Sequence, residues 1–139
     1  MRLALDTNVV VSAVLGSSAP TRLIELASER AIDLVTSAPL LKELSVVLAR
    51  PHIVRRLEIK GRSAAEAFAL YEALAEQVIP ASISRTAPEP EDDALLACAL
   101  AAGADLIVSG DGPVRNLKSF HRIPLLGPTE ALAIVGLPT

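Results

Sequence analysis

The sequence predicts an α/β domain in which helices cover both faces of a mainly parallel sheet. Short apolar runs alternate with segments of helical periodicity along the chain, which is the pattern of strand–helix–strand units. Hydrophobic residues make up 51% of the 139 residues, enough to bury a core. No repeat or linker divides the chain, so we expect one domain spanning residues 1–139.

The first half of the chain is predicted to contain two buried strands, each followed by helices. The strands are the apolar runs LALD and IDLVTS, at residues 3–6 and 32–37. The helices have apolar positions three and four residues apart and span residues 9–15, about 21–30 and 38–49. Pro51 ends the third helix or begins a further short one.

The second half continues the alternation. A helix is predicted over residues 63–77, where Ser63 and Glu66 have the spacing of a capping box. Two more helices are predicted at residues 92–103, closed by Gly103, and at residues 128–135. Strands are predicted at residues 78–80, at 105–110 and within 122–128, and a proline-rich loop at 85–91.

Charge and composition limit how the protein can meet a nucleic acid. The net charge is −3, and aromatic residues make up only 2%, so base stacking is nearly unavailable. A polynucleotide would have to be held through its phosphates. Two basic clusters have the charge for this, although a solvated helix face explains each of them equally well. They comprise Arg50, Arg55, Arg56, Lys60 and Arg62, and Arg115, Lys118 and Arg122.

No feature of the sequence predicts export or a membrane segment. No apolar run reaches the roughly 18–20 residues that span a bilayer. The acid at position 6 comes too early for the apolar region of a signal peptide. The single cysteine, Cys98, excludes an internal disulfide framework. We therefore expect a cytoplasmic protein that does not bind membranes.

Acidic residues lie beside the segments that are predicted to be buried. Asp6 and Asp111 are at the carboxyl ends of two strands, where sites form in open α/β sheets. Asp93 begins a helix and shares a face with its apolar residues, and Glu43 borders the apolar face of another helix. Asp105 lies at the amino end of its strand and is a poor candidate. Each acid also has an ordinary interpretation as a helix cap, a turn residue or a surface side chain.

Taken together, the acids favour a metal site. Four carboxylates that converge at one edge of a sheet repel each other unless a cation is bound. Oxygen ligands without cysteine or histidine suit Mg²⁺ or Mn²⁺. Such clusters activate water for attack on a phosphodiester.

Three segments of the chain resemble the PIN-domain nucleases, and in particular the VapC-like toxin components of toxin–antitoxin systems. The segments are LDTNVVVSAV, LLKELSVVL and EPEDDALLACALAAGADLIVSGD, in the same order and spacing over nearly the whole chain. The resemblance implies a three-layer α/β/α domain, a divalent cation and endoribonuclease activity. It also implies a homodimer that is neutralised by a small cognate antitoxin.

The resemblance also implies roles for individual residues. The catalytic and metal-ligating acids would be Asp6, Glu43, Asp93 and Asp111. Asn8, Asp92 and Ser109 would be supporting residues. Many relatives carry a further acid where this chain has Pro113, which leaves open whether one or two metal ions bind.

The resulting hypothesis is a Mg²⁺- or Mn²⁺-dependent cleavage of single-stranded RNA that leaves a 5′-phosphate and a 3′-hydroxyl. The strand would be held through phosphates by Arg50, Arg55, Arg56 and Lys60. Three alternatives stay open. They are a nuclease that acts on DNA, a catalytically weak PIN-fold binding or regulatory protein, and a haloacid dehalogenase phosphatase. The last needs a second aspartate where this chain has Asn8.

Overall fold

A six-stranded sheet with the order β3-β2-β1-β4-β6-β5 is the centre of the computed structural model. The structure describes residues 1–84 and 90–136, except for the side chains of Pro90, Glu91 and Pro113. The strands are β1 (Arg2–Leu5), β2 (Asp33–Thr36), β3 (Glu76–Gln77), β4 (Leu106–Val108), β5 (Ser119–Phe120) and β6 (Ile123–Leu126). Neighbouring strands are parallel except for β5 and β6, which confirms the mainly parallel sheet.

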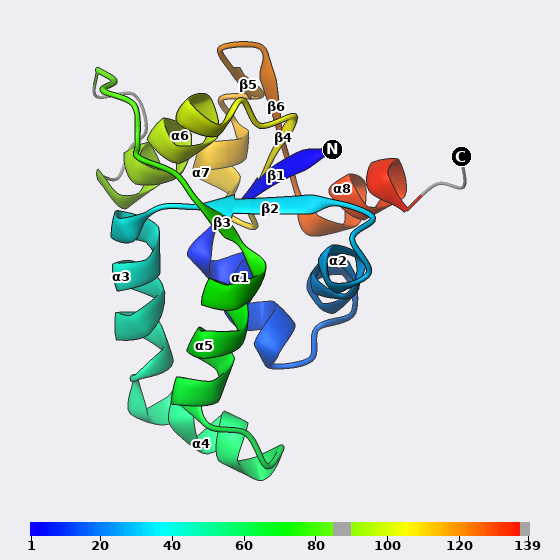
Figure 1. Cartoon of the computed structure of the whole chain (residues 1–139), viewed down its shortest axis with the longest axis vertical. Helices are drawn as coiled ribbons and strands as arrows, with labels where there is room; N and C mark the ends of the chain where they lie inside the picture. Colours follow the sequence, from blue (N-terminus) through cyan, green and yellow to red (C-terminus); the bar gives the residue numbers. More distant parts are fainter. Residues whose placement is uncertain (85–89, 137–139) are drawn as a thin grey trace.

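Helices cover both faces of this sheet, as Figure 1 shows. One face is covered by α1 (Thr7–Val14), α2 (Ser18–Ser28), α3 (Ala38–Leu48), α5 (Ala64–Leu74) and α8 (Pro128–Val135). The other face is covered by α6 (Pro90–Ala102) and α7 (Gly112–Arg115). The remaining helix, α4 (Pro51–Ile59), lies beyond the end of α3, far from the sheet. The predicted three-layer α/β/α fold is therefore confirmed.

Alternating side chains of the central strands supply the two cores. Leu3 and Leu5 of β1 pack among α1, α2, α3 and α5, whereas Ala4 between them packs against α6. Successive side chains of a strand point to opposite faces, so an uninterrupted apolar run is what a sheet covered on both faces requires. Leu3 is fully buried, and burying such a side chain contributes about 1.5–3 kcal/mol.

The strand order reverses direction at β1. The chain moves from β1 to β2 and β3 toward one edge, and then returns to place β4 on the other side of β1. Such a reversal is a topological switch point, and it opens a crevice beyond the carboxyl ends of the two strands. The candidate site lies there.

Both boundaries of α2 differ from the predicted helix at about residues 21–30. α2 begins at Ser18, three residues before the predicted Thr21, and includes Pro20 in its first turn. A proline is tolerated there because the first amides of a helix have no intrahelical partner. The helix ends at Ser28 because Arg30 has a φ of 62°, a left-handed conformation that an arginine does not signal in the sequence.

The predicted helix over residues 63–77 is too long. The cap is confirmed, since the Glu66 amide donates a 3.1 Å hydrogen bond to Ser63 Oγ. However, α5 ends at Leu74, and the strand predicted at residues 78–80 is instead β3 at Glu76–Gln77, which pairs with β2. Pairing with a neighbouring strand overrides the helical periodicity here. The predicted loop at residues 85–91 falls mostly outside the described residues.

Candidate active site

The carboxyl ends of four parallel strands place a row of small and acidic residues side by side. Leu5 pairs with Val108, and Val108 with Leu126, so the residues that follow these strands are neighbours as well. The same register on the other side of β1 places the residue after β2 next to the residue after β1. The row is Ser37, Asp6, Ser109 and Gly127.

Ser109 connects two of the predicted acids. Its hydroxyl donates a 2.8 Å hydrogen bond to Oδ2 of Asp6 and accepts a 3.0 Å hydrogen bond from the backbone amide of Asp111. Ser109 is fully buried and Asp6 is 7% exposed, so the bridge is shielded from water. The structure therefore brings Asp6, Ser109 and Asp111 together, as the sequence predicted.

Asp6 carries a charge that its surroundings disfavour. Burial raises the pKa of its carboxyl above the ordinary value, and the neighbouring Asp111 carboxylate adds to the rise. The hydrogen bond from Ser109 and the backbone amides of Thr7 and Asn8 lower the pKa and offset part of this rise. A buried acid beside a second acid has the electrostatics of a site that attracts a cation.

Both acids begin helices but do not use their carboxylates to cap them. Asp6 precedes α1 and Asp111 precedes α7. Neither side chain makes a capping hydrogen bond of full geometry, although the amides of Thr7 and Asn8 are close enough to the Asp6 carboxylate to lower its pKa. The backbone carbonyl of Asp6 instead accepts from the amides of Val9 and Val10. The sequence left Asp6 open between a helix cap and a site residue. In the structure its backbone starts the helix and its carboxylate turns to Ser109.

The other predicted acids come from helices on opposite sides of the sheet. Asp93 is half-buried in the first turn of α6, beside the buried Asp92, and Glu43 is half-buried on α3. Asn8 is exposed. Among the residues that the structure describes, no three histidine, cysteine, aspartate or glutamate side chains are grouped closely enough to hold a metal ion. The convergence of all four acids thus stays a prediction.

The donor set that is present fits a hard dication. The carboxylates of Asp6 and Asp111 and the hydroxyl of Ser109 offer only oxygen, which Mg²⁺ and Mn²⁺ prefer. Cys98 is fully buried, and burial is the main cause that raises its thiol pKa to about 11, so the thiol is protonated at neutral pH.

Neither Ser37 nor Gly127 was predicted as a site residue, and Ser37 is the one of the two that carries a polar side chain. It is fully buried at the end of β2, beside Asp6. The available signal was its position, since it follows an apolar strand directly, as Asp6 does. A serine in that place is also a common helix N-cap, and Ser37 is the N-cap residue of α3.

The basic residues predicted to hold RNA lie far from this row. Arg50, Arg55 and Arg56 are exposed on or beside α4, and the 11 residues of α3 separate them from the sheet by about 16 Å. Lys60 and Arg62 instead lie at the end of α1. Arg62 Nη1 donates a 2.7 Å hydrogen bond to the carbonyl of Val14, where a cation also suits the helix dipole.

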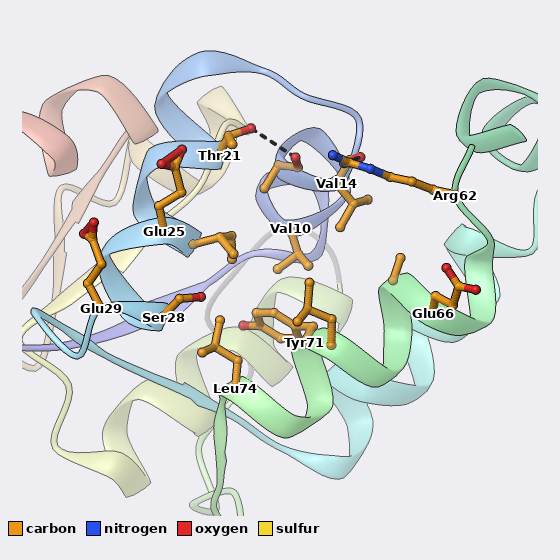
Figure 2. Close-up of a pocket in the computed structure, with 14 residues that line it drawn as sticks. Val10, Val14, Thr21, Glu25, Ser28, Glu29, Arg62, Glu66, Tyr71 and Leu74 are labelled. Carbon is orange, nitrogen blue, oxygen red and sulfur yellow. Dashed lines mark hydrogen bonds between the residues drawn. The ribbon is translucent and has the colours of Figure 1, made fainter. Parts of the chain in front are cut away.

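A separate cavity of about 540 Å³ lies between α1, α2 and α5 (Figure 2). Apolar side chains such as Val10 and Leu74 line it, and Glu25, Glu29 and Glu66 are among its polar residues. None of the predicted catalytic acids lines this cavity. It is therefore distinct from the acids at the strand ends.

The fold and the site define a three-layer α/β domain with paired acids at its topological switch point. A family model described as PIN domain matches residues 2–112, and the chain belongs to this family. PIN domains are generally metal-dependent nucleases, so the protein is a member of a nuclease superfamily. A search of curated proteins finds no match.

The described part of the chain contains no single helix that is long and apolar enough to cross a membrane. α1 and α2 meet those limits only as a pair that is bent by 91° at the break between them.

Proposed function

We propose that this protein is an endoribonuclease that uses Mg²⁺ or Mn²⁺ to hydrolyse phosphodiester bonds of single-stranded RNA. The observation that supports this most directly is the buried hydroxyl of Ser109 between Asp6 and Asp111 at the switch point of the sheet. Two acids held side by side in a crevice attract a dication, and a polyanionic substrate can approach them only when their charge is neutralised.

The proposed role of each residue follows from its position. Asp6 and Asp111 would hold the metal together with Glu43 and Asp93, and Ser109 would fix the orientation of the Asp6 carboxylate. A bound metal of this kind activates water and neutralises charge on the phosphate. No protein nucleophile is required, and the expected products are a 5′-phosphate and a 3′-hydroxyl.

The resemblance to VapC-like proteins, rather than a contact in the structure, supports a biological role. On that basis we propose a toxin that acts in the cytoplasm as a homodimer and is neutralised by a small cognate antitoxin. The sequence itself carries no legible motif that reads bases or 2′-hydroxyl groups, so the test compares RNA with DNA directly.

The test compares the parent protein with Asp6→Asn, using Asp33→Asn as the control. Asp33 is an exposed aspartate at the opposite, amino end of β2. Each protein is incubated with a mixed pool of single-stranded RNA, and separately with single-stranded DNA, in Mg²⁺, Mn²⁺ or EDTA. We expect the parent and Asp33→Asn to cut RNA only with a metal, and Asp6→Asn to lose at least about 100-fold in rate.

Two results would contradict the proposal. Cleavage of RNA by Asp6→Asn at the parental rate would show that Asp6 is not part of the catalytic site. Cleavage of DNA in place of RNA would replace the substrate class and leave the metal-dependent chemistry intact.

A further inference from the structure

Gly127 has no conformational reason to be glycine. It follows β6 and precedes α8, with a φ of −75° that any residue adopts. A Cβ atom at this position would lie 3.3 Å from Arg115 Nη1 and 3.3 Å from Glu130 Oε1. Such contacts are tighter than ordinary packing, so the missing side chain leaves room for the arginine and the glutamate.

The side chain of Arg115 occupies the space above Gly127 and is accessible to solvent. Arg115 Nη1 lies 3.9 Å from Glu130 Oε1, and the same oxygen accepts a 3.3 Å hydrogen bond from the Gly127 amide. The side chains of Arg115 and Glu130 are 41% and 61% exposed. An exposed ion pair of this length is weak, so the guanidinium lies beside Glu130 and stays able to bind another anion.

The strand register places this guanidinium in line with the acids. Gly127 neighbours Ser109, and Ser109 neighbours Asp6, so Gly127 lies two strand spacings, about 10 Å, from Asp6. Asp6, Ser109 and Gly127 each come directly after Leu5, Val108 and Leu126, which pair with one another. The side chains of Asp6 and Ser109, and a Cβ added at Gly127, therefore point to the face of the sheet that α6 and α7 cover. Arg115 also belongs to α7, the helix that Asp111 begins.

We propose that Arg115, held over Gly127 by Glu130, binds a phosphate of the RNA strand next to the bond that is cleaved. This inference rests on the proposed function and adds the direction in which the strand runs, from the acid pair past Ser109 toward β6. A guanidinium presents a planar pair of donors that matches two phosphate oxygens. Its positive charge also offsets the repulsion between the strand and the two carboxylates.

The experiment measures kcat, KM and their dependence on salt for Arg115→Ala, with Arg22→Ala as the matched control. Arg22 is also an arginine in exposed ion pairs, 44% exposed and paired with Glu25 and Glu29, but it lies on α2. We expect Arg115→Ala to raise KM for RNA about tenfold with a smaller change in kcat, and to reduce the slope of log KM against log salt by about 0.7, the value for one phosphate contact on a single strand. Arg22→Ala should behave as the parent.

Two further variants separate binding from a structural role. Gly127→Ala should shift the guanidinium slightly, raise KM less than Arg115→Ala does and retain the parental salt slope. Glu130→Gln keeps the arginine and should retain the parental salt slope. If Arg115 only joins α7 to α8, Arg115→Ala will lower Tm and leave the salt slope unchanged, which overturns the proposal.

A binding measurement distinguishes failure of this inference from failure of the proposed function. The affinity of a fluorescent single-stranded RNA is measured by anisotropy in an Asp6→Asn background, with and without Arg115→Ala, at several salt concentrations. A parent that does not cut RNA would refute the nuclease proposal. Equal affinities and equal salt slopes for the two proteins would refute the role of Arg115, whether or not the parent cuts.

Discussion

Ser109 is the residue on which the geometry of the candidate site depends. Its single hydroxyl acts as a donor to Asp6 and as an acceptor from the Asp111 amide, so both of its hydrogen-bonding directions are used. Because Ser109 is fully buried, water cannot replace either bond without a change in packing. It therefore fixes the Asp6 carboxylate relative to the backbone of Asp111.

Ser109→Ala should weaken metal binding and cleavage without removing a carboxylate. Loss of a side chain that orients a metal ligand lowers metal affinity or activity by about 10- to 100-fold. Stability should also fall by about 1–3 kcal/mol, because buried polar groups lose a partner. The measurements are Mn²⁺ affinity by calorimetry and the rate of RNA cleavage. Ser45→Ala, at an exposed serine on α3, is the control, and parental affinity in Ser109→Ala would show that the bridge is dispensable.

Asp6→Asn should stabilise the protein at neutral pH when no divalent metal is added. The pKa of Asp6 is raised in the folded state, so the fold favours the protonated carboxyl. The stabilising contribution is complete below the ordinary pKa of an aspartate and is lost as the pH rises through the folded value. The amide has no charge to lose, and it can still accept the hydrogen bond from Ser109.

The measurement is the Tm of both proteins by calorimetry, from pH values below the ordinary pKa of an aspartate up to pH 7. We expect Asp6→Asn to unfold a few degrees above the parent at pH 7, and the difference to vanish in acid. A variant that melts below the parent at neutral pH would show that the charged carboxylate is well solvated.

The regular helices and the buried strands could be predicted from local pattern, and the irregular connections could not. The apolar strands and the capped start of α5 each have a sequence signal that matches the structure. The hairpin between β5 and β6 has none, because its turn places His121 and Arg122 at φ values of 48° and 67°. Such turns usually contain asparagine or glycine, so β5 was not predicted. The short helix α7 was predicted as a turn for a different reason, because the residues of SGDGP favour turns.

The site was predicted unevenly. Asp6, Ser109 and Asp111 follow short strands, and parallel pairing brings such positions together once the strand order is known. Glu43 and Asp93 depend on how α3 and α6 pack, which periodicity does not determine. The assignment of Lys60 to RNA binding considered charge alone, whereas its side chain lies beside Gly16 at the end of α1.

The distance of α4 from the sheet predicts that its arginines act only on long substrates. Removing Arg55 and Arg56 together should leave cleavage of a very short oligonucleotide unchanged and should raise KM several-fold for an RNA long enough to reach α4. The measurement is KM against substrate length. An equal rise in KM at every substrate length would mean that these residues act near the cleaved bond.

At the level of the whole domain, a preserved metal site should make stability depend on Mn²⁺. An ion that binds only the folded state stabilises it by RT ln(1 + [Mn²⁺]/Kd), about 2.7 kcal/mol at 100 times Kd. We expect the Tm of the parent to rise steadily with Mn²⁺ and to return to its starting value with EDTA, and we expect no rise in Asp6→Asn. A parental Tm that does not change with Mn²⁺ would indicate a PIN-fold protein with a binding or regulatory role.

The contact between Asp6 and Ser109 joins positions that are 103 residues apart, and β1 needs β4 as a neighbour on that side. During translation the edge of β1 that faces β4 therefore stays unpaired until β4 has left the ribosome. A nascent or prematurely released chain that stops before β4 has no partner for the Asp6 carboxylate. The order of synthesis thus delays assembly of the acid pair until β4 has been made.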